Sequence, residues 1–185
     1  MTNILNTIQK RMQALIKKIP PELSLSLSIL FSMLSGYLYL IDNMIAAALT
    51  LSLSSYFATH AKDNTAGQQK PIRPQSKQVT DRIRDAFIFT GITLNPNIPL
   101  NIGLITMAAV IFVPHLISLR QTLSKQKIDP KISRADIDMI LITSTMIATF
   151  IRPALCYSLL LITALCIGSF IEMQFRTYKD RSKRK

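Results

Sequence analysis

The chain has 185 residues, of which 49% are apolar and 17% are charged, and its formal net charge is +12. Soluble domains usually contain about 25% charged residues, and here the charges are confined to stretches between long uncharged runs, so the composition excludes an ordinary soluble domain. Because the basic residues flank these runs instead of covering a folded surface, we expect no nucleic-acid partner.

The first 22 residues predict an amphipathic helix. Apolar residues recur at helical spacing from Ile4 to Ile19 with four basic residues between them, and Pro20 and Pro21 end the pattern. A basic amphipathic helix binds in the headgroup layer of an anionic leaflet. We therefore assign residues 1–22 to an interfacial helix, with membrane lipids as its partners.

Six apolar runs follow, and we interpret each as a membrane span. The first begins LSLSLS, which alternates like a strand, but it is too long and too uniformly uncharged for one, and serine is tolerated in membrane helices. We predict an all-α integral membrane bundle of six transmembrane helices over residues 23–172, followed by a basic cytoplasmic tail at 173–185. The predicted spans are 23–41, 44–59, 78–94, 98–119, 137–151 and 154–171, and the third is amphipathic in its first part and apolar from Ala86.

Lysine and arginine are distributed very unevenly between the two sides of such a bundle. The N-terminal segment carries 4, the loop 60–85 carries 6, the loop 120–136 carries 5 and the tail carries 6, whereas the alternate loops carry Arg152 alone. Basic residues concentrate on the cytoplasmic side of membrane proteins. We therefore expect a multi-pass protein of the cell membrane with both termini in the cytoplasm.

Few groups with reactive chemistry lie inside the predicted spans. Asp138 and His115 each lie within a few residues of a span end, whereas a proton or ion pathway needs charges deeper in the bundle, so we do not expect a transporter. Cys156 and Cys166 share one apolar run without metal-ligand spacing. We interpret both as small apolar residues of a span.

Three carboxylates and an imidazole flank the loop between the second and third spans. His60 and Asp63 are three residues apart where the second span ends, and Asp81 and Asp85 are four apart where the third begins. Each pair lies on one helix face, and a hairpin of the two helices would bring both faces together. Clustered carboxylates repel unless a divalent cation lies among them. Mg²⁺ or Mn²⁺ held there could bind a pyrophosphate.

A simpler interpretation also accounts for these aspartates. Lys77, Asp81 and Asp85 form a ladder with a spacing of four residues, which is typical of a solvated ion-pair stripe on a helix. Aspartate also suits the first turn of a helix, where it interacts favourably with the helix dipole. The spacing alone leaves both interpretations open.

The pattern resembles the signature of the CDP-alcohol phosphatidyltransferase family. That signature is Asp-x2-Asp-Gly-x2-Ala-Arg-x8-Gly-x3-Asp-x3-Asp, and it runs from the end of a second span to the start of a third. Only three of its eight defined positions match here, and all three are aspartates. Laid on this chain without a gap, the eight positions are His60, Asp63, Asn64, Gly67, Gln68, Lys77, Asp81 and Asp85.

The resemblance extends beyond the motif. The segment DAFIFTGI, from Asp85 to Ile92, looks like the start of the family's third span, and FIEMQFRTYKDR resembles its last span and exit. The closest type is the short archaeal one that makes archaetidylinositol phosphate. The resemblance implies transfer of a phosphatidyl or archaetidyl group from a CDP-activated lipid to an alcohol, with release of CMP, by a homodimer.

The resemblance also implies roles for individual residues. Mg²⁺ or Mn²⁺ would be held at His60, Asp63 and Asp81, and Asp85 would be the base that deprotonates the acceptor hydroxyl. For the basic loop that holds Arg120 and Arg134, the positive-inside bias is the stronger explanation. The substrate-binding candidates are Gly67 of the signature, Arg120 and Arg134 in the basic loop, and Arg73 and Lys77, which could supply the positive charge that the family has where this chain has Gln68.

The departures from the signature leave two hypotheses. His60 replaces a carboxylate and suits softer metals, Asn64 and Lys77 replace glycines, and Gln68 replaces an arginine. The first hypothesis is an enzyme with a degenerate motif. The second is a catalytically inactive protein on the same scaffold, which binds lipid or nucleotide or pairs with an active paralogue.

Overall fold

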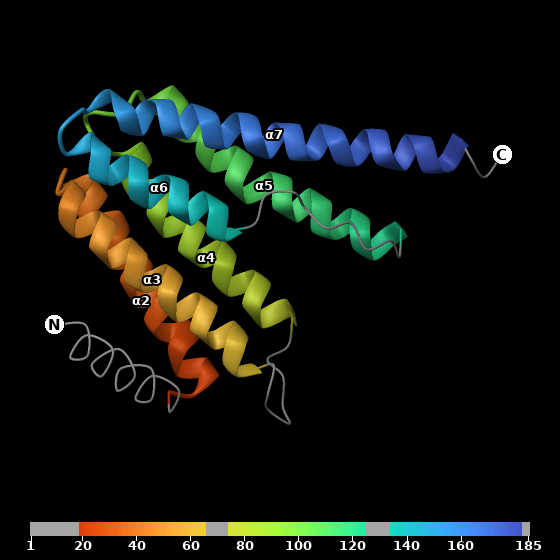
Figure 1. Cartoon of the computed structure of the whole chain (residues 1–185), viewed down its shortest axis with the longest axis horizontal. Coiled ribbons are helices and arrows are strands. Elements are labelled where there is room, and N and C mark those ends of the chain that lie inside the picture. Colours follow the sequence, from red (N-terminus) through yellow and green to blue (C-terminus); the bar gives the residue numbers. More distant parts are fainter. Residues whose placement is uncertain (1–18, 66–73, 125–133, 183–185) are drawn as a thin grey trace, which may run out of the picture.

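A computed structural model describes residues 19–65, 74–124 and 134–182 of the chain. These residues form six α-helices (Figure 1). The predicted interfacial helix at 1–22 lies almost entirely outside them, so it stays a prediction. The helices are α2 (Pro21–Leu40), α3 (Met44–Thr65), α4 (Pro74–Thr93), α5 (Leu100–Ser124), α6 (Arg134–Ala148) and α7 (Pro153–Ser182).

The six helices pack side by side in a closed ring. Following the ring, α2 contacts α3, α3 contacts α6, α6 contacts α7, α7 contacts α5, α5 contacts α4, and α4 returns to α2. Consecutive helices α3 and α4 are not ring neighbours in the described part of the chain, because α2 lies between them. A polar side chain that joins α4 to α3 or α6 therefore crosses the interior of the ring.

Small residues let α2 approach its neighbours closely. The LSLSLS segment is helical, and two of its three serines belong to a fully buried stripe. The stripe consists of Ser24, Ser28, Ser32 and Ser35. The Ser35 hydroxyl donates to the Ala47 carbonyl on α3 at 3.1 Å. On the α4 side, a Cβ at Gly36 or Gly91 would overlap the backbone of the facing helix. Small residues that allow such contact stabilise helix pairs in membranes.

The apolar core lies inside the ring, and many large apolar side chains also face outward. Leu30, Phe112 and Tyr157 expose more than half of their surface, as expected for helices that contact lipid. One hydrogen bond crosses the core from α2 to α6, where the hydroxyls of Tyr39 and Thr145 are 2.6 Å apart. The largest fully buried apolar side chains are Tyr39, Phe89, Leu51, Ile88, Ile92 and Leu141.

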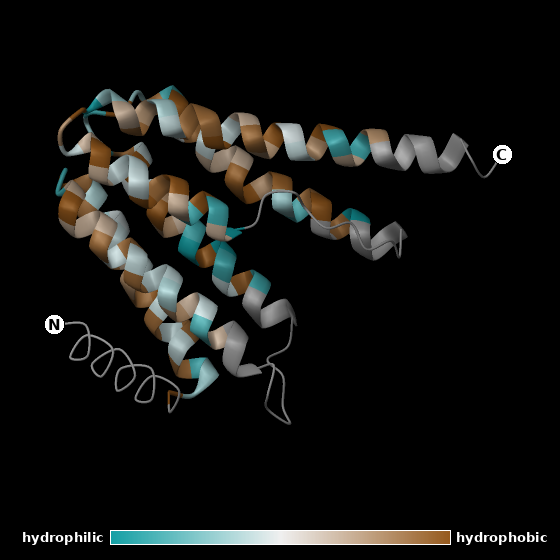
Figure 2. Cartoon of the chain, viewed as in Figure 1, coloured by the Kyte–Doolittle hydropathy of each residue, from teal (hydrophilic) through white to brown (hydrophobic). Residues whose placement is uncertain are grey.

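Three segments are long and apolar enough to cross a membrane: α2, residues 100–117 of α5, and residues 153–175 of α7. The chain is therefore a multi-pass membrane protein in its described part, and crossing by α3, α4 and α6 stays a prediction. These three helices are more polar or shorter, α6 having only 15 residues. Figure 2 shows hydrophilic residues on α4 and at the start of α6, whereas much of α5 and α7 is hydrophobic.

The turns at one end of the bundle are joined by polar side chains. Asp42 adopts a φ of 60°, which lets the predicted turn close between α2 and α3, and aspartate tolerates this region better than most residues. The Asn95 amide donates to Asp42, and the Arg152 guanidinium donates to Asn97 at 3.3 Å. A hollow of about 440 Å³ lies among these turns. It is at the opposite end of the helices from the predicted site.

Candidate functional site

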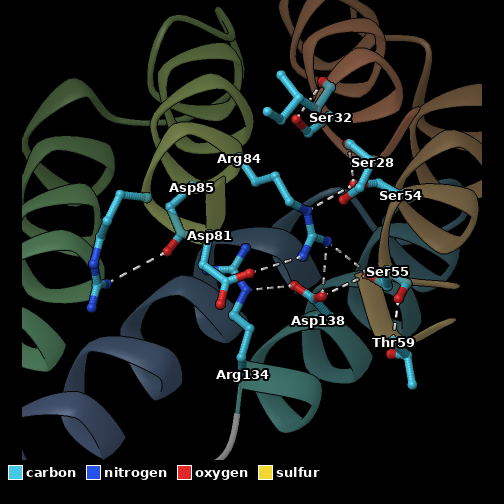
Figure 3. Close-up of polar contacts among 12 residues, drawn as sticks. Ser28, Ser32, Ser54, Ser55, Thr59, Asp81, Arg84, Asp85, Arg134 and Asp138 are labelled. Atoms are coloured by element: carbon cyan, nitrogen blue, oxygen red, sulfur yellow. Dashed lines mark hydrogen bonds and ion pairs between the residues drawn. The ribbon is translucent and has the colours of Figure 1, made fainter. Parts of the chain in front are cut away.

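Six charged side chains on α4 and α6 form one ionic cluster at the other end of the bundle (Figure 3). The helical spacing of three and four residues within each segment puts members of the same helix on one face, and the ring then makes α4 and α6 face each other across its interior. We call this set the ionic cluster. It consists of Asp81, Arg82, Arg84 and Asp85 on α4 and Arg134 and Asp138 on α6.

Arg84 is the centre of the cluster and is 99% buried. Its Nε donates to the Ser54 hydroxyl on α3 at 3.0 Å, and its Nη2 lies 3.3 Å from an Asp138 carboxylate oxygen. Its Nη1 lies 3.7 Å from Asp81, one turn earlier on α4. Ser54 in turn donates to the Ser28 carbonyl at 2.8 Å. A single guanidinium thus links α3, α4 and α6, and Ser54 extends the network to α2.

Asp138 receives donors from three helices. The Ser55 hydroxyl on α3 donates to its Oδ2 at 2.6 Å, the same oxygen that faces Arg84. Arg134, one turn earlier on α6, donates from Nε to Oδ1 at 3.1 Å. Buried charges are stable only when paired and hydrogen-bonded, and both carboxylate oxygens of Asp138 meet this condition.

Asp85, the predicted base, is buried and lies between two arginines. The Arg82 guanidinium is 3.8 Å from its Oδ2, and Arg134 is ion-paired with its Oδ1. Burial lowers the pKa of Arg134, and the Asp138 carboxylate opposes that shift. Because arginine is not deprotonated in proteins, Arg134 remains a cation at neutral pH. Asp85 therefore lies beside permanent positive charge.

His60, which occupies the first position of the signature, lies against α2. Its Nδ1 is 3.4 Å from the Ser24 hydroxyl, and its ring stacks near Tyr56 with centroids 6.3 Å apart. The side chain is half-buried. The sequence predicted a direct hairpin of α3 and α4, and the ring instead places α2 between these two helices.

Four of the remaining predicted residues have side chains that the structure does not describe. Asp63 and Lys77 lie on α3 and α4, but their side chains are outside the described part of the chain, as are Gly67 and Arg73 entirely. The roles predicted for these four residues stay predictions.

The two predicted loop arginines lie on different helices and bind different partners. Arg120 near the end of α5 donates to the Gln174 side chain on α7. Arg134 at the start of α6 binds Asp85 and Asp138. The structure thus brings Arg134 together with the predicted base, whereas the hydrogen bond of Arg120 joins α5 to α7.

The metal-ligating side chains that the structure describes do not fit a site for a divalent cation. In residues 19–65, 74–124 and 134–182, no group of three or more His, Cys, Asp or Glu side chains could hold a metal ion. Asp81 and Asp85, the aspartates of the signature on α4, already have guanidinium partners. Because Asp63 is among the predicted ligands and its side chain is not described, the Mg²⁺ or Mn²⁺ prediction stays untested.

Sequence reasoning missed Arg84 and the serines that bind it. The signal was present in the periodicity of α4, where Arg84 lies one turn before Ile88 and two turns before Ile92, both fully buried. Residues at these spacings share one face of a helix. The same periodicity places Asp138 one turn after Arg134 on α6.

Comparison with known proteins gives a match in fold and none in sequence. No protein-family model matches the chain, and no curated protein matches it. The fold is similar to that of the phosphatidylinositol phosphate synthase of Mycobacterium tuberculosis in apo form, with a TM-score of 0.73 and 16% identity over 93% of this chain and 95% of that one. The same synthase with CDP-DAG bound gives a TM-score of 0.70 and 17% identity over 92% and 91% of the two chains.

At 16–17% sequence identity, the similarity to the synthase structures shows the fold alone. It agrees with the all-α membrane bundle that the sequence predicted and extends over nearly the whole length of both chains. The narrower resemblance to the archaeal type stays a prediction.

Proposed function

We propose that the chain binds a CDP-activated lipid at the cytoplasmic ends of α3, α4 and α6 and transfers its phosphatidyl or archaetidyl group to an alcohol, releasing CMP. The observation that carries this proposal is the likeness in fold, over more than nine tenths of both chains, to a synthase whose structure holds CDP-DAG. Asp81 and Asp85 lie on α4 with the spacing of the signature, which supports placing the reaction at the ionic cluster.

The proposed reaction assigns one proton transfer to Asp85. The acceptor hydroxyl oxygen attacks the phosphorus that carries the lipid, a new O–P bond forms, and the bond from that phosphorus to CMP breaks. The hydroxyl proton passes to Asp85, and CMP leaves with the electron pair. A base must lie within hydrogen-bond reach of the proton it takes, so Asp85 would exchange part of its contact with Arg82 or Arg134 for the acceptor.

Arg134 supports a phosphorylated acceptor for this reaction. It lies beside Asp85, and a guanidinium binds phosphate in bidentate geometry. A phosphate held there would place the acceptor hydroxyl near the proposed base. The sequence analysis adds Gly67, Arg73, Lys77 and Arg120 as substrate-binding candidates, and we retain them in the proposal.

A second function is favoured by a specific observation. Asp85 is buried and already paired with two arginines, so it would have to give up one of these contacts before it could accept a proton from an acceptor. A protein that binds CDP-lipid or an active paralogue without catalysis would tolerate this arrangement. We therefore keep the non-catalytic scaffold as the alternative.

The experiment is CMP release from CDP-lipid by the purified full chain in lipid nanodiscs, with inositol phosphate and other alcohols as acceptors. We expect Asp85→Asn to lower CMP release by about 100-fold or more, because a positioned base contributes about 10²–10⁴-fold. Asp42→Asn, at the opposite end of the bundle, is the matched control and should retain wild-type activity, since asparagine also tolerates positive φ.

Two other results would count against the enzyme. CMP release that is unchanged in Asp85→Asn removes the proposed base. CDP-lipid binding without CMP release, for every alcohol supplied, supports the scaffold instead.

We also propose a homodimer with both termini in the cytoplasm, as the resemblance and the positive-inside bias predict.

A further inference from the structure

The ionic cluster carries no net charge of its own. Its three carboxylates belong to Asp81, Asp85 and Asp138, and its three guanidiniums belong to Arg82, Arg84 and Arg134. Clustered carboxylates repel one another unless a cation lies among them. Each carboxylate here has a guanidinium partner on its own helix or on the facing one, so the repulsion is relieved by the chain itself.

Arg84 is fixed in this role by its surroundings. All three of its guanidinium nitrogens lie near an oxygen partner: Nε binds Ser54, Nη1 faces Asp81, and Nη2 faces both Ser55 and Asp138. Only 1% of its side chain is exposed. Moving it away would leave Asp138 buried with less compensation, which is strongly unfavourable. A divalent cation between Asp81 and Asp138 would also be repelled by this permanent charge.

Arg134 neutralises the carboxylates that face it, and some of its N–H groups have no hydrogen-bond acceptor among the described residues. It pairs with Asp85 and Asp138 at once, and it exposes 21% of its side chain. Its Nη2 is buried and makes no hydrogen bond within the described residues. Because a guanidinium has five N–H donors in a fixed fork, Arg134 can hold its carboxylates and still donate to an anionic oxygen.

We infer that Arg84 and Arg134 are the built-in counter-cations of Asp81, Asp85 and Asp138, and that the site binds its pyrophosphate-bearing ligand without a divalent cation. The claim that the ligand binds without a divalent cation rests on the proposed function, which supplies CDP-lipid as the ligand. The claim that the two arginines are the counter-cations rests on the ion pairs alone. Arginine can clamp phosphoryl oxygens as divalent cations do. Replacing the divalent cation by arginines therefore keeps positive charge where the phosphate would bind.

The first experiment measures Mn²⁺ binding to the full chain in nanodiscs, from the loss of the electron paramagnetic resonance signal of free Mn²⁺. We expect wild type to bind no more Mn²⁺ than Asp85→Asn does. We expect Arg134→Met to bind Mn²⁺ at least tenfold more tightly than wild type, and adding Asp85→Asn should abolish the gain. Arg84→Met should also gain Mn²⁺ binding, and here adding Asp138→Asn should abolish the gain, because Arg84 pairs with Asp138. Arg152→Met is the matched control that gains nothing.

The second experiment measures CDP-lipid binding to wild type in EDTA and in Mg²⁺, and we expect affinities that agree within twofold. Mn²⁺ binding by wild type that Asp85→Asn removes would overturn the inference. A requirement for Mg²⁺ in CDP-lipid binding, or no gain of Mn²⁺ binding in Arg134→Met, would also overturn it. If CDP-lipid binds under neither condition, the proposed function fails, and the Mn²⁺ comparison still decides whether the arginines are the counter-cations.

Discussion

At the scale of single residues, the candidate site depends on an arginine that hydropathy alone assigns to a loop. The apolar run of the third predicted span begins at Ala86, so Arg84 falls among the basic residues before it. Helical periodicity instead places Arg84 on the buried face, with Ile88 and Ile92. The two criteria disagree because hydropathy scores an arginine as polar, whereas the Arg84 guanidinium can be buried when other helices supply its partners.

The partners of Arg84 on other helices could not be predicted from the sequence. Ser54 and Asp138 are 30 and 54 residues away from it, and no local pattern connects them. Asp81 and Asp85 were different, because their spacing of four residues is itself a sign of a shared helix face. Local spacing thus predicted the carboxylates of the motif and includes their pairs with Arg82 and Arg84 on the same helix. The pairs that involve Arg134 and Asp138 on α6 emerged only from the packing of distant helices.

Removing the Arg84 guanidinium should destabilise the fold. We expect Arg84→Met to lower the free energy of unfolding by about 3–5 kcal/mol, because it leaves Asp138 buried with weaker compensation. The loss should be partly recovered in Arg84→Met/Asp138→Asn, whose effect should fall short of the sum of the single variants by about 1 kcal/mol or more. The measurement is chemical unfolding in mixed micelles, followed by helical circular dichroism.

The control for this cycle is Arg152→Met. Arg152 exposes 75% of its side chain and lies 4.0 Å from Asp42 at the opposite end of the bundle, and exposed pairs contribute only about 0–1 kcal/mol. Strictly additive effects of Arg84→Met and Asp138→Asn would show that the two side chains are not coupled.

At the scale of helices, the predicted spans agree with the helices in their apolar parts and differ from them at the ends. The second predicted span ends at 59 and the last at 171, whereas α3 continues to Thr65 and α7 to Ser182. Hydropathy reports how far a segment lies in lipid, and a helix can continue into water beyond that depth. Pro74 starts α4, which suits a residue that favours the first helical position.

The contact between α2 and α4 should depend on its glycines. Gly91→Ala would place a Cβ against the carbonyl of Gly36, so the helices would have to move apart at a cost of about 1–3 kcal/mol for overpacking. Gly168→Ala on α7 is the matched control, since its Cβ would meet nothing within 4 Å. That substitution should be neutral or stabilise the helix by up to about 1 kcal/mol.

Thermal unfolding in nanodiscs compares the two glycine variants directly. A lower melting temperature for Gly91→Ala, with none for Gly168→Ala, is the expected result. If both variants unfold at the wild-type temperature, the close approach of α2 and α4 does not contribute to stability.

At the scale of the whole molecule, composition and hydropathy predicted the class of fold but not the order of its helices. An all-α membrane bundle follows from the long uncharged runs, and the likeness to the mycobacterial synthase supports it over nearly the full chain. The ring order follows from contacts between distant helices, such as α2 with α4 and α5 with α7. These contacts depend on complementary surfaces such as Gly36 against Gly91, which no periodicity within one helix reveals.

The orientation of the bundle remains a prediction from charge, and it determines which compartment the ionic cluster faces. Because 21 of the 22 basic residues lie in segments assigned to one side, that side should be cytoplasmic. The test uses single cysteines in a chain whose Cys156 and Cys166 are replaced by serine. Asn43→Cys reports on the α2–α3 turn, and Ala135→Cys reports on the start of α6 beside the cluster; both positions are exposed.

A membrane-impermeant maleimide applied to intact cells should label Asn43→Cys and leave Ala135→Cys unlabelled. Lysis should then make Ala135→Cys reactive, which controls for a position that is merely unreactive. The opposite pattern would place the ionic cluster outside the cell, where CDP-activated lipids made in the cytoplasm would not reach it from the inner leaflet. The proposed transferase would then lose its substrate, although the ring of helices and its internal ion pairs would be unaffected.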